Sequence, residues 1–174
     1  MAAQMSLPTP LFARNKVKQL SQSMDSAQSY ADWLSFASEQ DQLLGKDQWR
    51  RSHNPKFFDY DEISRRCSLL KSLLENGDTH ELLFALNEGI HGNMGGMGKA
   101  VLYHQALAGT HELIDRYVRT ITAALRQVAS ATEHDVPFEE KLDFFRRASH
   151  CYGRSALMMS GGAGLIYFHH GVVN

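Results

Sequence analysis

The sequence predicts a mainly α-helical protein that ends in one strand, one glycine-rich turn and one further helix. Apolar residues recur every three or four positions through most of the 174-residue chain. After residue 153 the pattern changes to short apolar runs separated by glycines. We therefore expect a flexible N-terminal arm over residues 1–25, a helical domain over residues 26–153 and the start of a second domain over residues 154–174.

The first expected helix covers residues 26–44. The preceding arm is polar and contains Pro8 and Pro10, whereas this segment carries large side chains at helical spacing, and Gly45 would end it. The residues on its predicted face are Tyr30, Trp33, Leu34, Ala37, Gln40 and Leu44. A loop follows, which contains Trp49, Pro55 and the aromatic cluster Phe57, Phe58 and Tyr60.

The second expected helix begins near Asp59 or Asp61, and Gly77 is a suitable C-terminal cap. Its apolar positions are Ile63, Cys67, Leu70, Leu73 and Leu74. Asp78 and Glu81 form a capping-box pattern that opens a third helix over residues 82–88. The stretch from 89 to 98 is too rich in glycine for a helix interior.

The fourth expected helix covers residues 111–130, with Thr110 as its predicted cap. Its apolar face comprises Leu113, Ile114, Tyr117, Ile121, Ala124, Leu125 and Val128. Pro137 suits the first turn of a fifth helix, which should end around Tyr152 and Gly153.

Composition and charge argue against a nucleic-acid-binding, a disulfide-bonded secreted or a membrane-spanning protein. A net charge of -1 gives no basic field for nucleic acid. Cys67 and Cys151 lie far apart, which favours free thiols and a reducing compartment. The N-terminus has no signal-peptide pattern. The apolar stretch 156–173 is about long enough to span a bilayer, but its glycines and histidines argue against it. We expect a cytoplasmic protein, with peripheral attachment to a membrane or lipid surface as an open alternative.

Two patterns are similar to ligand-binding motifs, one for nucleotides and one for zinc, but each lacks required residues. The run 92–99 is similar to a phosphate-binding loop, but Asn93 and Ala100 stand where the motif needs glycine and Ser or Thr, so we expect no nucleotide. His80-Glu81 and His111-Glu112 each begin a zinc-helix pattern whose second histidine is missing. We therefore predict no metal and no cofactor.

The C-terminal segment has the pattern of an anion-binding turn. Residues 155–159 read as a buried strand, residues 160–164 as a turn and residues 165–173 as a helix. Backbone N–H groups at such a turn can hold a phosphate or the oxyanion formed when an ester is attacked. A tight turn with no ligand is an equally good interpretation of the spacing alone.

The order of several short blocks resembles the patatin-like lipases that carry a helical N-terminal extension, DUF3336. The blocks are Trp33-Leu34, Leu43-Leu44-Gly45 with Trp49, Phe58-Asp59-Tyr60, Gly89 to Gly96, Leu102-Tyr103, Gly109-Thr110 with Leu113-Ile114 and Tyr117, Glu140 to Phe145, Gly153 to Ala163, and His169 to Val173. The resemblance covers residues 30–173. It implies that residues 154–174 open a truncated α/β patatin-like domain.

The resemblance also implies a site. Gly161, Gly162 and Ala163 match the family's oxyanion loop, while Ile166 stands where the family usually has a further glycine. The family's nucleophile is a serine in Gly-x-Ser-x-Gly, paired with an aspartate, and no such motif occurs here. We expect the N-terminal part of a serine lipase for triacylglycerol or related acyl esters, without catalytic residues and hydrolysing no ester alone.

An alternative function is a non-catalytic helical module that binds a membrane surface or a partner lipase chain. Basic pairs at 50–51, 65–66 and 146–147, with Trp49 and neighbouring aromatics, could meet phospholipid headgroups. Ordinary solvated helix faces explain the same pairs, and we prefer that interpretation.

Overall fold

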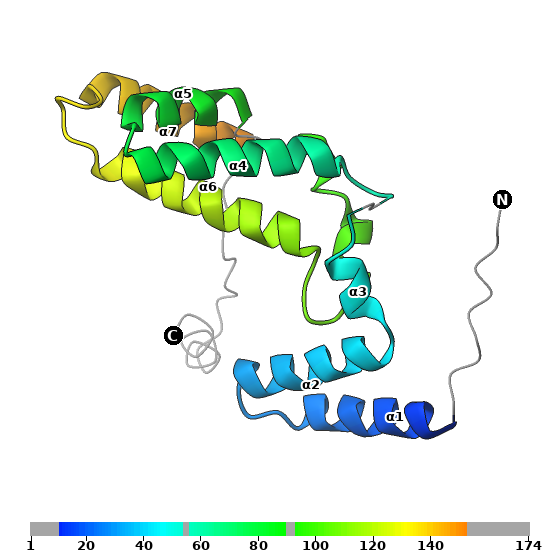
Figure 1. Ribbon diagram of the computed structural model, residues 1–174. Helices are drawn as coiled ribbons and strands as arrows, with labels where there is room; N and C mark the ends of the chain where they lie inside the picture. Colours follow the sequence, from blue (N-terminus) through cyan, green and yellow to red (C-terminus); the bar gives the residue numbers. More distant parts are fainter. Residues whose placement is uncertain (1–10, 54–55, 90–92, 153–174) are drawn as a thin grey trace.

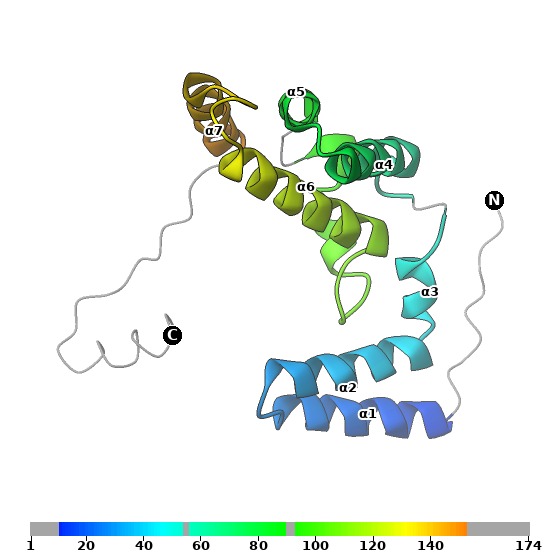
Figure 2. The same cartoon turned by 60° about the vertical axis from the view of Figure 1, so that its left-hand side comes forward.

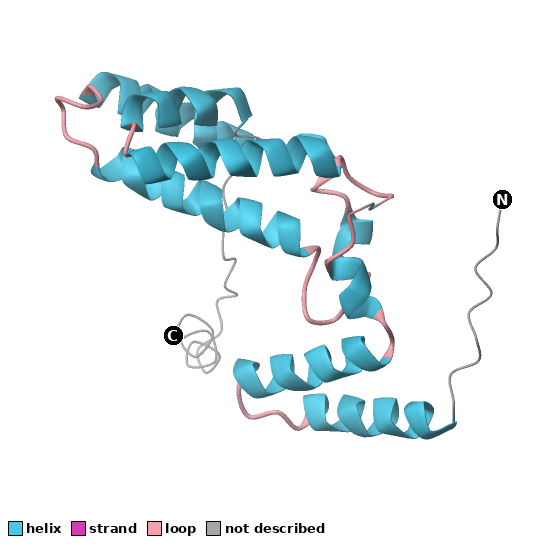
Figure 3. Ribbon diagram, in the orientation of Figure 1, coloured by secondary structure: helices cyan, strands magenta, loops and turns pink. Residues whose placement is uncertain are grey.

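The computed structural model describes residues 11–53, 56–89 and 93–152. These residues are mainly helical and contain no strand, which confirms the predicted class for this part of the chain (Figure 3). The helices are α1 (Leu11–Asp25), α2 (Tyr30–Leu43), α3 (Lys46–Arg50), α4 (Tyr60–Asn76), α5 (Thr79–Gly89), α6 (Glu112–Ser130) and α7 (Phe138–Tyr152), with 3-10 turns η1 (Met94–Gly96) and η2 (Ala100–Tyr103). The predicted strand, turn and helix over residues 155–173 lie outside the described residues.

The helices form two layers joined by α3. Figure 1 shows α1 and α2 side by side as a hairpin, while α4, α5, α6 and α7 pack together as a bundle. Figure 2 shows the same separation from a second side. The loop before α6 descends from the bundle to α2, so the two layers meet at that loop and at α3 (Figure 1).

The first helix corrects one prediction. We expected a flexible arm over residues 1–25, but residues 11–25 form α1. Leu20 of α1 is 3% exposed, and Lys16 lies 3.1 Å from Glu39 of α2. The apolar positions of this segment are too few to signal a helix alone, and contact with α2 stabilises it.

Two boundaries near α2 follow local rules. Ser29 caps α2, because its hydroxyl oxygen accepts a hydrogen bond from the N–H of Asp32 at 3.1 Å. Gly45, at φ 68°, ends α2 as predicted. The chain then forms the short helix α3 where we expected a loop, and Trp49 of α3 packs against the bundle core.

The caps of α4 and α5 are confirmed. Asp59 accepts a hydrogen bond from the N–H of Glu62 at 3.0 Å, and Gly77 ends α4 at φ 72°. Asp78 accepts from the N–H of Glu81 at 3.0 Å, which is the first half of the predicted capping box. These contacts involve near neighbours, so the sequence alone could specify them.

The core lies between α4, α5 and α6, and α7 closes it with Phe144 and Ala148. Its most buried members include Ile63, Leu82, Leu86, Leu102, Ile114, Tyr117, Val128 and Val136. Most of the apolar positions predicted for α4 and α6 are buried there. None of the described helices combines the length and the hydropathy that a bilayer crossing requires.

Candidate functional site

The oxyanion-loop candidates Gly161, Gly162 and Ala163 lie outside the described residues, so their role stays a prediction. Within the described part, buried polar groups gather where the loop before α6 meets α2 and α3. We call this place the polar junction and define it by Asp41, Arg50, Thr110 and His111. Three of these side chains are almost fully buried, at 1% exposure for Asp41, 5% for Thr110 and 2% for His111.

His111 caps α6 with its side chain. Its Nδ1 accepts a hydrogen bond from the N–H of Leu113 at 3.2 Å, and its Nε2 lies 2.8 Å from the carbonyl oxygen of Ser52. Both contacts are satisfied by the neutral tautomer that carries its proton on Nε2. Burial lowers the pKa of His111 and outweighs the opposing hydrogen bond to Ser52.

The predicted cap, Thr110, is therefore wrong by one residue. The hydroxyl of Thr110 instead donates to the carbonyl oxygen of Leu102 at 3.0 Å. A histidine is not among the usual capping residues, so the sequence rule favoured threonine. Only the surrounding helices reveal that the imidazole is buried in position to accept the N–H of Leu113.

Three aromatic rings pack edge-on against the imidazole ring of His111. The ring centroids of Phe58, Trp49 and Tyr60 lie 5.1, 5.7 and 5.9 Å from that of His111. The corresponding interplanar angles are 68°, 89° and 81°. The aromatic cluster seen in the sequence is thus a packing shell around a buried histidine.

Asp41 and Arg50 connect the remaining parts of the polar junction. Asp41 accepts hydrogen bonds from the N–H groups of Leu107 and Ala108. Arg50 donates from Nε to the carbonyl oxygen of Thr110 at 2.9 Å and from Nη2 to Asp115 at 3.4 Å. The two charged side chains therefore supply hydrogen-bond partners for backbone N–H and C=O groups of the loop before α6.

A second buried charge lies inside the bundle. Nη2 of Arg66 donates to the carbonyl oxygen of Ala85 at 2.9 Å, and Nε has no hydrogen-bond partner among the described residues. Gly89 makes room for this guanidinium, because a Cβ at that position would lie 1.9 Å from Nη2. Burial raises the pKa of the nearby Tyr117, whose hydroxyl donates to the sulfur of Met94 at 3.2 Å.

Most arginines of the adjacent basic pairs contact other groups of the fold. Arg51 pairs with Asp47 on α3, Arg65 with Glu62 at 2.7 Å, and Arg147 with Asp143 at 2.8 Å. Their neighbours Arg50 and Arg66 bond to backbone carbonyl oxygens inside the fold. Adjacent residues on a helix lie about 100° apart, so the two side chains of a helical pair leave the helix in different directions.

A basic groove lies instead between α4 and α6. Its volume is about 720 Å³, and it is lined by Arg50, Lys71, Leu74, Glu112, Asp115, Arg116, Arg119, Thr120 and Ala123. Sequence reasoning missed this site. The available signal was the spacing of Arg116, Arg119 and Arg126, which places the three on one face of α6. No group of three His, Cys, Asp or Glu side chains in the described part of the chain could hold a metal ion.

Taken together, these features define a helical domain whose buried polar groups organise its loops and whose outer face carries a basic groove. The family described as "Domain of unknown function (DUF3336)" matches residues 11–150, and the chain belongs to this family. The match agrees with the resemblance in the sequence blocks and excludes only the first ten and last 24 residues.

The similar curated proteins are named as lipid hydrolases. A patatin-like phospholipase domain-containing protein of Cryptococcus neoformans is 34% identical over 84% of this chain and 17% of its own length. One of Debaryomyces hansenii is 34% identical over 91% of this chain and 20% of its own length. A triacylglycerol lipase of Schizosaccharomyces pombe is 29% identical over 92% of this chain and 25% of its own length.

This chain therefore spans a quarter or less of the length of these relatives. No solved structure matches it.

Proposed function

We propose that this chain is the N-terminal helical part of a patatin-like serine lipase that acts on triacylglycerol or related acyl esters. We further propose that residues 11–152 contribute structure and surface to that enzyme and take no part in bond cleavage. Family membership, and relatives named as phospholipases and a triacylglycerol lipase, support the first statement. The geometry of His111 supports the second.

Ester hydrolysis by a side chain needs a nucleophile and a group that accepts its proton. Among the histidines that the structure describes, His111 is the buried one, but its Nδ1 lone pair accepts the N–H of Leu113 and its Nε2 contacts the Ser52 carbonyl oxygen. No lone pair is left to take a proton from a hydroxyl. The sequence also contains no Gly-x-Ser-x-Gly motif, in which the family places its nucleophile.

An esterase assay tests this proposal. The purified chain should release no p-nitrophenol from p-nitrophenyl butyrate above the rate in buffer. The variant Gly161→Asp serves as the matched comparison, because it would block an oxyanion loop at the predicted position. Turnover by the natural chain that disappears in Gly161→Asp would overturn the proposal.

A second function, attachment to a lipid surface, is favoured by the basic groove between α4 and α6. A partner lipase chain is the remaining alternative, and co-purification with a full-length relative tests it.

A further inference from the structure

The groove between α4 and α6 has more positive charge than its own acids neutralise. At its α3 end, Arg50 lies 3.4 Å from Asp115, and Glu112 lies 4.0 Å from Arg51. Arg116 and Arg119 form no ion pair within the described part of the chain. Asp115 is therefore engaged with Arg50 of α3, whereas Glu112 makes only a long, exposed contact with Arg51. Arg116 and Arg119 are available to an anion.

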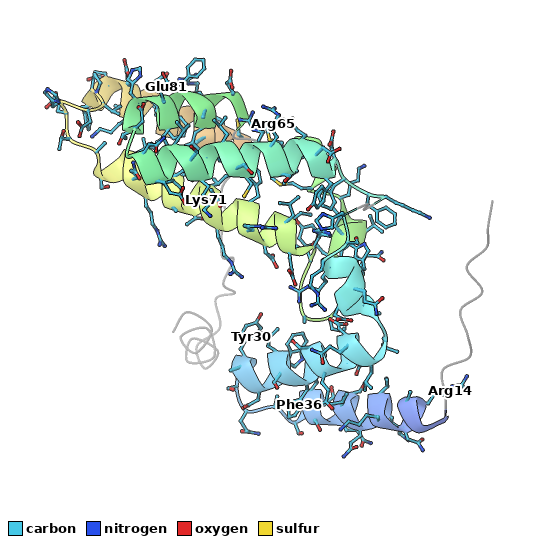
Figure 4. The ribbon with its side chains drawn as sticks, viewed as in Figure 1. Arg14, Tyr30, Phe36, Arg65, Lys71 and Glu81 are labelled. Carbon is cyan, nitrogen blue, oxygen red and sulfur yellow. The ribbon has the colours of Figure 1, made fainter. Side chains whose placement is uncertain are left out.

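Lys71 adds a third cation from the opposite wall. Its ammonium lies 3.7 Å from Glu75, but both side chains are mostly exposed, at 70% and 66%. Such an exposed pair contributes little and exchanges easily for a stronger partner. Figure 4 labels Lys71 on α4, beside the helix that carries the two arginines.

The arginines occupy the solvent face of α6. Arg119 follows Arg116 by three positions, and Arg126 follows Arg119 by seven. These spacings place all three on one side of the helix. The opposite stripe of α6, which includes Ile114, Tyr117 and Ile121, is buried in the core. The three guanidinium groups therefore share a side of the domain that core packing does not occupy.

A second hollow continues the groove toward α2. A second hollow of about 350 Å³ shares Arg50, Asp115 and Arg119 with the groove and is lined on its other side by Tyr30 and Leu34. Tyr30 is 73% exposed and stacks on Trp33 with centroids 6.1 Å apart. Figure 4 shows Tyr30 at the end of α2, on the side that faces α6.

We propose that this groove binds the phosphate of an anionic phospholipid headgroup and holds the domain against an anionic lipid surface. Two arginines of one helix line the groove, with a lysine on the opposite wall, and these cations supply the charge and the hydrogen-bond donors that a phosphate needs. The choice of a lipid as the source of that phosphate depends on the proposed function. It is also supported by the exposed ring of Tyr30 at the edge of the second hollow, because tyrosine side chains suit the boundary between headgroups and acyl chains.

Vesicle flotation tests the proposal with the full 174-residue chain. The chain should float with phosphatidylcholine vesicles that contain phosphatidic acid and stay at the bottom with phosphatidylcholine alone. The double variant Arg116→Gln/Arg119→Gln should bind the anionic vesicles about twenty-fivefold more weakly, since each cation near such a surface adds about fivefold. High salt should weaken the binding of the natural chain.

A charge-matched control separates a site from general attraction. The double variant Arg65→Gln/Arg147→Gln removes the same charge from two arginines that already pair with Glu62 and Asp143. It should float like the natural chain. Equal loss in both double variants, or flotation of neither the natural chain nor the control, would overturn the proposal.

Inorganic phosphate distinguishes the two sources of the ligand. If phosphate raises the melting temperature of the natural chain but not of Arg116→Gln/Arg119→Gln, and the natural chain does not float, the groove is a site for free phosphate and the lipid proposal is wrong. Flotation does not depend on ester cleavage. A chain that floats yet hydrolyses an ester overturns only the proposed function, and an inactive chain that never floats overturns only this inference.

Discussion

Asp41, near the end of α2, holds the backbone N–H of Leu107 with both of its carboxylate oxygens, at 3.0 Å from Oδ1 and 2.9 Å from Oδ2. Oδ2 also accepts the N–H of Ala108 at 2.8 Å. The two partners of Asp41 belong to the loop that enters α6. A single buried carboxylate thus joins the α1–α2 hairpin to the bundle.

Replacing Asp41 with asparagine should lower the free energy of unfolding by about 1–3 kcal/mol, because the neutral amide accepts weaker hydrogen bonds than the carboxylate and its NH2 group would take the place of one of the two oxygens. Urea unfolding followed by circular dichroism measures the loss. Asp25→Asn, at an exposed position at the end of α1, is the matched control and should change stability little. Equal stability of the two variants would contradict the assigned role of Asp41.

His111 should make the domain less stable in mild acid. Its pKa is lowered in the folded chain by burial, whereas in the unfolded chain it stays near 6.5. As the pH falls through about 6.5, the unfolded chain gains a proton that folded His111 does not take up, so stability decreases. The decrease continues until the pH passes below the lowered pKa. Melting temperatures measured from about pH 7.5 down to about pH 5 follow this change.

The variant His111→Gln should be less stable at neutral pH, since it loses the α6 cap and the aromatic packing. It should also lose part of the pH dependence over that range. His104→Gln, at an exposed position, should keep the full dependence. Asp135 does not interfere with this measurement. A hydrogen bond from Thr132 lowers the pKa of Asp135 below its ordinary value of 3.8, so the influence of Asp135 on stability falls at a more acidic pH. An unchanged pH profile in His111→Gln would refute the assignment.

A side chain at Gly89 should destabilise the fold while Arg66 is present. In Gly89→Ala the new Cβ would lie 1.9 Å from Nη2 of Arg66, so the buried guanidinium must move or the helix must shift. We expect a loss of about 1–3 kcal/mol, typical of overpacking. In Gly45→Ala no atom lies within 4 Å of the new Cβ, and only the backbone conformation at φ 68° is unfavourable, by about 1–2 kcal/mol.

A double-mutant cycle shows whether the Gly89 effect depends on Arg66. Gly89→Ala should cost much less in an Arg66→Met background than in the natural chain. Chemical denaturation of the four proteins gives the coupling energy. Additive effects would mean that Arg66 is not the group that meets the new methyl.

The two cysteines should differ in reactivity. Both are free, with Cys67 buried at 6% exposure and Cys151 exposed. A thiol reagent such as dithionitrobenzoate should modify one group in the folded chain and two in denaturant, since buried thiols are protected. Cys151→Ser should remove the fast phase, and Cys67→Ser should leave it. Rapid modification of Cys67 in the native chain would contradict the burial of this thiol between the helices.

The sequence by itself determined the helices whose ends are local and whose faces are strongly periodic. Asp59, Gly77, Asp78 and Pro137 mark helix ends through contacts with near neighbours or through their own backbone preferences, so no other part of the fold is needed to recognise them. The ordered short blocks likewise indicate the family through their residues and spacing alone. The C-terminal oxyanion-loop residues remain a prediction from sequence.

The tertiary structure decided the features that depend on residues far apart in the chain. Helix α1 is stabilised by α2, His111 replaces Thr110 as a cap because aromatic rings from α3, α4 and the segment between them enclose it, and Arg66 is buried because Gly89 leaves room. The basic groove exists only because α4 and α6 lie side by side. Helical periodicity specifies which face of a helix is apolar, but long-range packing determines which helix covers that face and which charges are brought together.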